Sequence, residues 1–270
     1  MFEPKLCFSS LGCPEMDHPQ IVQLAVDEGI WGVELRGKSE NAHISPQTPA
    51  VRRKQIARLY ADNGVAIAGI TSYVQMADIE KAAQNQDQIM RYAELCAQMG
   101  ASYLRIYLGQ MQNQPLEDQV APLLAQACRS ADSFPVKILL EMHDALKTGA
   151  QARSLIRAAG DPENLGVIFD TVLPFRQQED PLPAWQSVAD SVGALHIRAV
   201  GSDAHGETHQ VLPEDSRYPF DALLKTLLQA QFDGPWVILW ERIFDPTLCP
   251  MPQAIGAYRR AIECCMQRLG

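Results

Sequence analysis

The sequence predicts a single (β/α)₈ barrel over residues 1–270, and three observations carry this prediction. Eight short apolar segments recur along the chain, segments with helical patterns separate them, and the length of 270 residues is close to the roughly 250 that such a barrel takes. The centres of the apolar segments lie about 30 residues apart, which leaves room for one helix and two loops between strands. Eight strand–helix units match a closed barrel better than an open doubly wound sheet, which usually has fewer strands.

The apolar segments are predicted as strands because turn residues bound them and strand-forming residues fill them. The eight predicted strands cover residues 6–11, 32–36, 67–74, 103–109, 137–143, 165–171, 193–200 and 236–242.

The segments between the strands carry helix start and stop signals. The first helix begins at Asp17, a good N-cap, and ends at Gly29; the second begins at Thr48-Pro49, a cap followed by a first-turn proline, and ends at Gly64. The predicted helices cover residues 17–28, 49–63, 80–99, 117–131, 148–159, 179–191, 219–231 and 252–269.

Composition and charge exclude several classes of protein. Hydrophobic residues make up 47% of the chain, enough for a large core, and no stretch approaches the roughly 20 apolar residues that span a bilayer. The N-terminal segment lacks a long apolar run and the seven scattered cysteines form no C-x-x-C pair, so we expect a cytoplasmic protein with free thiols. The net charge of −9 repels phosphate backbones and argues against a nucleic-acid partner.

Polar residues interrupt four predicted strands near their ends, where a barrel of this class carries its chemistry. They are Glu141 and His143 on the fifth strand, Asp170 on the sixth, His196 and Arg198 on the seventh and Glu241 on the eighth.

A common partner would explain polar residues at one level of consecutive buried strands. An unpaired carboxylate in a core costs several kcal/mol or shifts its pKa, so Glu141, Asp170 and His196 together indicate a divalent cation. Carboxylates plus one histidine suit Mn²⁺, Mg²⁺, Co²⁺ or Zn²⁺, and the sequence does not choose among them. The alternative is that these are ordinary strand-end residues, solvated or paired with Arg36, Arg105 or Arg198.

Other polar residues are candidates for substrate contacts. Glu34 and Arg36 share a face of the second predicted strand, and they either bind substrate or pair with each other. Arg105 shares a face of the fourth strand with Tyr107 and is a further candidate.

Two loops carry histidines near the predicted mouth of the barrel. His43 lies between the second and third predicted strands. The polar segment with His205 and His209, between the last two strands, reads as a solvated lid rather than a second metal site.

These motifs resemble the xylose-isomerase-like barrel family, whose relatives include sugar isomerases and epimerases, inosose dehydratases and endonuclease IV. The resemblance rests on G-V-E-L-R, L-R-I-Y-L-G, L-L-E-M-H-D, F-D-T-V-L-P-F-R, L-H-I-R and D-G-P-W-V-I-L-W-E-R, which together span nearly the whole chain. In the family, a Glu, an Asp, a His and a further Glu on the last four strands bind one divalent metal. The resemblance assigns the first three to Glu141, Asp170 and His196.

The chain departs from the family pattern at three positions. The fourth ligand is expected five residues after Gly234, where this sequence has Leu239, and Glu241 lies two residues further on the same face. We therefore expect Glu241 to serve as the fourth ligand. Leu173 and Ala199 stand where the family often has a His and an Asp.

The resemblance implies a metal-dependent isomerase or epimerase that acts on a small sugar or polyol through an enediolate. Glu141 is then both ligand and base, and Glu241 is the base on the opposite face of the reacting carbon. The expected substrate-binding residues are His143, Arg198, Glu34, Arg36 and Arg105.

Three alternatives to this activity stay open, and the resemblance also implies self-association. The first is an inosose-type dehydratase that uses the same metal. The second is an endonuclease, which the six histidines and the acidic charge disfavour. The third is a non-catalytic barrel that binds a small molecule.

Overall fold

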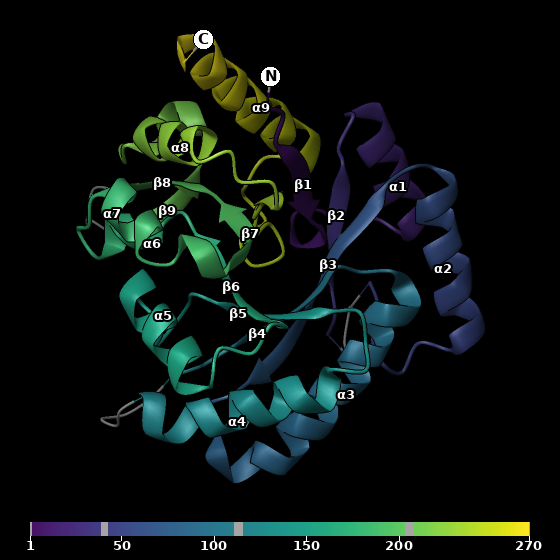
Figure 1. Cartoon of the computed structure of the whole chain (residues 1–270). Helices are drawn as coiled ribbons and strands as arrows, with labels where there is room; N and C mark the ends of the chain where they lie inside the picture. Colours follow the sequence, from purple (N-terminus) through teal and green to yellow (C-terminus); the bar gives the residue numbers. More distant parts are fainter. Residues whose placement is uncertain (1, 39–42, 111–115, 203–207, 270) are drawn as a thin grey trace.

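The structure, a computed structural model, describes residues 2–38, 43–110, 116–202 and 208–269. Its centre is a closed barrel of eight parallel strands in the order β1-β10-β7-β6-β5-β4-β3-β2, so the predicted (β/α)₈ fold is confirmed (Figure 1). The barrel strands are β1 (Lys5–Ser9), β2 (Gly32–Arg36), β3 (Ala66–Gln75), β4 (Tyr103–Tyr107), β5 (Lys137–Glu141), β6 (Leu165–Asp170), β7 (Val192–Ile197) and β10 (Pro235–Ile238).

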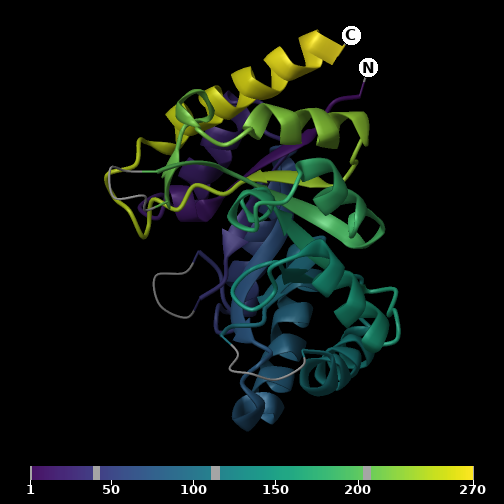
Figure 2. The ribbon, with the colours of Figure 1, turned by 90° about the vertical axis from the view of Figure 1, so that its left-hand side faces the viewer.

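Helices surround the barrel, and the last of them lies beside the N-terminal strand, so that the two chain ends are close together (Figures 1 and 2). None of the helices in the described part of the chain is long and apolar enough to cross a membrane. The helices are α1 (His18–Asp27), α2 (Ala50–Asp62), α3 (Ala82–Met99), α4 (Leu116–Ala131), α5 (Gly149–Ala158), α6 (Leu173–Arg176), α7 (Pro181–Gln186), α8 (Phe220–Gln229) and α9 (Met251–Leu269).

Side-chain capping explains where α1 begins but not where α2 begins. The Asp17 carboxylate accepts a hydrogen bond from the backbone N–H of Gln20, and the side-chain oxygen of Gln20 accepts one from the backbone N–H of Asp17. The prediction of Thr48 as the cap of α2 was wrong, because the cap position is Pro49 and makes no side-chain hydrogen bond. The Thr48 hydroxyl instead accepts from the backbone N–H of Ser45 and closes the preceding turn.

Three regions differ most from the predicted elements, and the first is the strand expected at 236–242, which ends at Ile238. The helix expected at 179–191 is reduced to the six residues of α7, which begins at Pro181, and a separate 3₁₀ turn follows at 189–191. The strand expected at 193–200 ends at Ile197, and the polar segment after it forms an antiparallel hairpin of β8 (Ala199–Ser202) and β9 (Thr208–Val211). Side-chain oxygens of Thr171 and Tyr258 accept from the backbone N–H groups of Arg198 and Ala199, which ends the parallel ladder there.

A small apolar cluster fills the inside of the barrel. It consists of Cys7, Ala68, Tyr103, Leu139, Ile168, Ala194 and Val237, all at most 2% exposed. Tyr103 fits there because its strand neighbour is Gly69, where an added Cβ would lie 2.2 Å from the Tyr103 ring.

The strand period sets the next layer of the barrel interior. Side chains two residues further along a strand point the same way, one layer nearer the C-terminal mouth. From five of the seven cluster residues, this count gives Arg105, Glu141, Asp170, His196 and Leu239 as members of that layer.

Candidate active site at the C-terminal mouth of the barrel

His196 lies at the centre of the polar layer and bridges two carboxylates. Its Nδ1–H donates to Oε1 of Glu141 at 2.7 Å, and its Nε2–H donates to Oε2 of Glu34 at 2.9 Å. Burial alone would lower the pKa of His196, but the charges of Glu34 and Glu141 and the hydrogen bonds to them raise it to about 10. The imidazole is therefore protonated at neutral pH, and both its nitrogens are donors.

Glu34 and Tyr103 form the floor beneath this imidazole. The Tyr103 hydroxyl donates to the same Glu34 oxygen at 2.7 Å. Burial raises the pKa of Glu34, but the charge of His196 and the hydrogen bonds from His196 and Tyr103 lower it below its usual value. The other oxygen of Glu34 is buried and has no hydrogen-bond partner among the described residues.

Arg105 on β4 pairs with Glu141 at the end of β5. Its Nε donates to Oε2 of Glu141 at 2.8 Å, its Nη2 donates to the same oxygen, and its Nη1 donates to the Ser72 carbonyl at 2.8 Å. Burial opposes the charge of Glu141, but Arg105 and His196 hold the pKa of this carboxyl well below its usual range. The Arg105 guanidinium also lies against the rings of Tyr73 and Tyr107, 5.8 and 4.5 Å from their centroids.

Arg198 links the end of β6 to the segment after β10. Its Nε donates to Oδ1 of Asp170 at 3.1 Å and its Nη2 donates to Oδ2, so the pair is bidentate. Its Nη1 donates to Oε2 of Glu241 at 2.9 Å. The side chains of Arg198 and Asp170 are only 7% and 0% exposed, whereas that of Glu241 is 32% exposed.

Gln210 on β9 fixes the backbone that carries Glu241. Its side-chain oxygen accepts from the backbone N–H of Glu241 at 2.9 Å, and its amide donates to the Leu239 carbonyl. Sequence reasoning missed Gln210, because its role depends on the β8–β9 hairpin, which was expected to be a loop. It also missed Tyr103, whose apolar run gives no sign that its hydroxyl meets a carboxylate.

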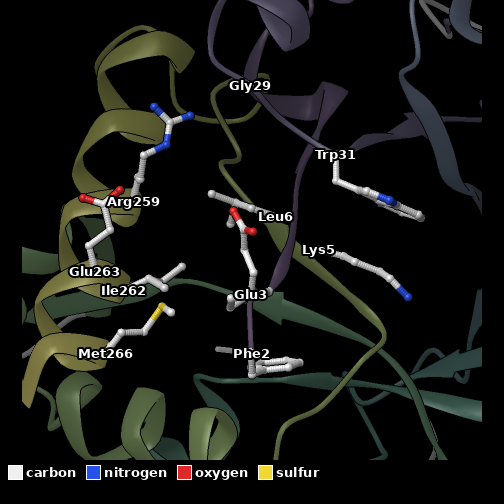
Figure 3. A pocket seen from close by; sticks show the side chains of 11 residues that line it. Phe2, Glu3, Lys5, Leu6, Gly29, Trp31, Arg259, Ile262, Glu263 and Met266 are labelled. Atoms are coloured by element: carbon white, nitrogen blue, oxygen red, sulfur yellow. The ribbon is translucent and has the colours of Figure 1, made fainter. Parts of the chain in front are cut away.

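A cavity of about 160 Å³ opens at the mouth of the barrel, and Arg105, Arg198 and Leu239 are among the residues that line it. Its depth holds Glu34, Glu141 and His196, and its rim adds His143, Glu241 and three rings from Tyr73, Tyr107 and Phe244. A second cavity, of about 570 Å³, lies at the opposite, N-terminal end of the strands, between β1 and α9 (Figure 3). Trp31 and Lys5 face Ile262, Glu263 and Met266 across it, and none of the strand-end polar residues lines it, so the mouth is the candidate active site.

The remaining predicted residues do not line the cavity as far as the structure describes them. Arg36 on β2 donates through Nε to the Tyr73 hydroxyl at 3.1 Å. His43 donates to the Met16 carbonyl at 3.1 Å and does not line the cavity. His209 lies on β9, and His205 falls outside the described residues.

The donor set does not fit a divalent metal. Both oxygens of Asp170 accept from Arg198, the two oxygens of Glu141 accept from His196 and Arg105, and both nitrogens of His196 donate protons. Leu239 fills the inward position beside them. Over the described ranges, no three His, Cys, Asp or Glu side chains are grouped so that they could hold a metal ion. The pairing with Arg105 and Arg198 corresponds to the salt-bridged alternative left open by the sequence.

Comparison with known proteins defines the family to which this chain belongs. Residues 22–266 match the model of the xylose isomerase-like TIM barrel family, and the chain belongs to this family. A comparison with curated proteins gives no match.

Solved structures share the fold at low sequence identity. The IOLI protein, solved with a bound zinc atom, is 16% identical with a TM-score of 0.78, over 98% of each chain. An L-ribulose 3-epimerase is 16% identical with a TM-score of 0.76, over 99% of this chain and 97% of its own. A xylose isomerase-like/4-hydroxyphenylpyruvate dioxygenase fusion protein is 18% identical with a TM-score of 0.77; the match covers 96% of this chain and 42% of the fusion.

Proposed function

We propose that the chain is an isomerase or epimerase that moves a proton on a small sugar or polyol-derived carbonyl compound at the mouth of the barrel. One observation carries the proposal: the partly exposed carboxylate of Glu241 lies in the same cavity as the guanidinium groups of Arg105 and Arg198. A base and fixed positive charges in one water-restricted cavity are what proton abstraction next to a carbonyl requires. The epimerase among the similar structures agrees with this class of reaction.

In the proposed reaction, Glu241 is the general base. Its carboxylate takes a proton from the carbon beside the carbonyl, and the electron pair of that C–H bond forms the enediolate. Arg105 and Arg198 stabilise the negative charge that develops on the oxygens. Return of the proton to the former carbonyl carbon, while the hydroxyl proton passes to the other oxygen, completes an isomerisation. For an epimerisation, water donates a proton to the opposite face of the same carbon and Glu241 releases its own proton to water.

Glu141 has a positioning role in this proposal rather than the role of base. Its two oxygens already accept from His196 and Arg105, and its lowered pKa makes it a weak proton acceptor. It holds the Arg105 guanidinium in the cavity wall and keeps His196 protonated. The divalent metal implied by the resemblance takes no part, because its donors are engaged.

The rim of the cavity suits a sugar. Tyr73, Tyr107 and Phe244 line it, and Phe244 is 63% exposed, so aromatic faces are available to the C–H surfaces of a sugar ring. His143, with a side chain 41% exposed, is placed to meet a hydroxyl group.

Hydrogen exchange tests the proposal. Wild-type protein is incubated in D₂O with a panel of aldoses, ketoses and inososes, and NMR follows loss of the proton next to the carbonyl. We expect exchange with at least one compound and loss of exchange in Glu241→Gln. Glu263→Gln, an exposed carboxylate on α9 at the other end of the barrel, is the matched control and should exchange like wild type.

A second candidate function is a binding protein without catalysis, which Leu239 and the paired carboxylates favour. A sugar that stabilises the wild-type protein against heat but undergoes neither exchange nor conversion would support this candidate. Dehydration of an inosose in the same NMR assay would identify the lyase alternative.

A further inference from the structure

The carboxylates of the polar layer are bound by side chains of the chain itself. Arg198 pairs with Asp170 and Glu241, and Arg105 pairs with Glu141. Glu34 and Glu141 also contact the two ring nitrogens of His196. A divalent ion placed between Asp170 and Glu241 would lie beside the Arg198 guanidinium, and the two cations would repel each other.

The geometry of Arg198 is that of a bridging cation. One guanidinium contacts both oxygens of Asp170 at the end of β6 and reaches Glu241 beyond β10, so it connects two strand ends that flank β7 in the barrel. Arginine is suited to this task because its planar fork matches a carboxylate and stays charged when buried. The apolar Leu239 removes a donor from the same layer.

We propose that the Arg198 guanidinium replaces a divalent metal at this site. It lies between Asp170 and Glu241, where a metal would otherwise bind, and the site works without a metal ion. Two residues carry this inference: Arg198, which contacts both oxygens of Asp170 and reaches Glu241, and Leu239, which offers no donor atom from its side chain. This inference does not rest on the proposed reaction, because metal binding is measured without substrate.

Metal binding to four variants tests the proposal. The proteins are wild type, Arg198→Met, Leu239→Glu and the double variant Arg198→Met/Leu239→Glu, each purified without a metal-affinity tag and titrated with Mn²⁺, Co²⁺ and Zn²⁺ by calorimetry. We expect no stoichiometric binding to wild type and one equivalent bound to the double variant. Removing Arg198 frees Asp170, and the new glutamate adds the missing donor. Arg242→Met is the control, since Arg242 pairs with Glu15 at 2.6 Å outside the cavity.

Either of two results would overturn the proposal. One is a wild-type protein that holds one equivalent of metal and loses it in Asp170→Asn, which can be measured even when the other variants fail to fold. The other is a double variant with a wild-type circular dichroism spectrum that still binds no metal. A failure of the sugar-exchange assay leaves these readouts unchanged, so the two proposals fail separately.

Discussion

The hydroxyl of Tyr103 donates a 2.7 Å hydrogen bond to Oε2 of Glu34 at the floor of the cavity. Tyr103→Phe would leave this buried carboxylate with a single partner, His196. We expect the free energy of unfolding to fall by about 1–3 kcal/mol, the cost of a hydrogen bond lost from a buried charged group. Urea denaturation measures the change. Tyr107→Phe, which loses a bond to Gln75 at the exposed rim, should change it by less than about 0.5 kcal/mol.

The buried pair of Arg105 and Glu141 predicts a larger effect. Glu141→Gln keeps the shape but leaves the Arg105 guanidinium without its countercharge, and breaking a buried pair costs about 3–5 kcal/mol. Asp87→Asn breaks the exposed pair with Arg91 on α3 and should cost less than about 1 kcal/mol. Equal losses in the two variants, measured by thermal and urea unfolding, would contradict the buried role of Glu141.

His43 predicts a dependence of stability on pH. Burial and the neighbouring His18 lower the pKa of His43 to about 4, and its Nδ1 is buried without a partner among the described residues. In the unfolded chain a histidine titrates near 6.5, so between pH 6.5 and 4 the unfolded state binds the extra proton. The stabilisation from the neutral side chain is complete above pH 6.5 and is lost as the pH falls toward 4.

The variant His43→Gln tests this assignment. The free energy of unfolding of wild type should decline by on the order of 1–3 kcal/mol more than that of His43→Gln between pH 6.5 and 4. His209→Gln, with an exposed side chain on β9, should follow the wild-type curve. Parallel curves for wild type and His43→Gln would assign the acid sensitivity to other groups.

Gln210 predicts a kinetic effect without a large loss of stability. Gln210→Leu removes both hydrogen bonds to the segment that carries Glu241, so the proposed base loses its position. On a substrate found by hydrogen exchange, we expect kcat to fall by about 10–100-fold and KM to change less. The exposed Gln98→Leu on α3 should be unaffected. An unchanged kcat in Gln210→Leu would contradict the idea that the β8–β9 hairpin positions Glu241 for the reaction.

The sequence was sufficient to predict the barrel, because each strand and helix leaves a local signal. The polar residues at the strand ends were also recognisable, since a carboxylate in a buried strand breaks the apolar pattern. The partners of these polar residues could not be predicted from the sequence. Whether Arg198 pairs with Asp170 or with Glu34 depends on how far its side chain reaches across the strands. Self-association, implied by the resemblance, stays a prediction.

The hairpin shows why the rest of the mouth was missed. Its two strands are four residues each and partly polar, so no alternation of apolar residues announces them. They begin where the hydroxyl oxygens of Thr171 and Tyr258, rather than a neighbouring strand, accept the backbone N–H groups of Arg198 and Ala199. The chain leaves the barrel at this point as β8. These two hydrogen bonds join residues that are far apart in the sequence, so the pattern of neighbouring residues does not predict them.

Gly69 has a consequence for how deep a substrate can enter. The Tyr103 ring fits inside the barrel because no side chain projects from its neighbour on β3. An alanine at 69 would push the ring out of that place and carry the Glu34–His196 floor with it. The position of the pocket floor thus depends on a single absent methyl group, so a change at one apolar position can reshape the pocket while every polar residue stays the same.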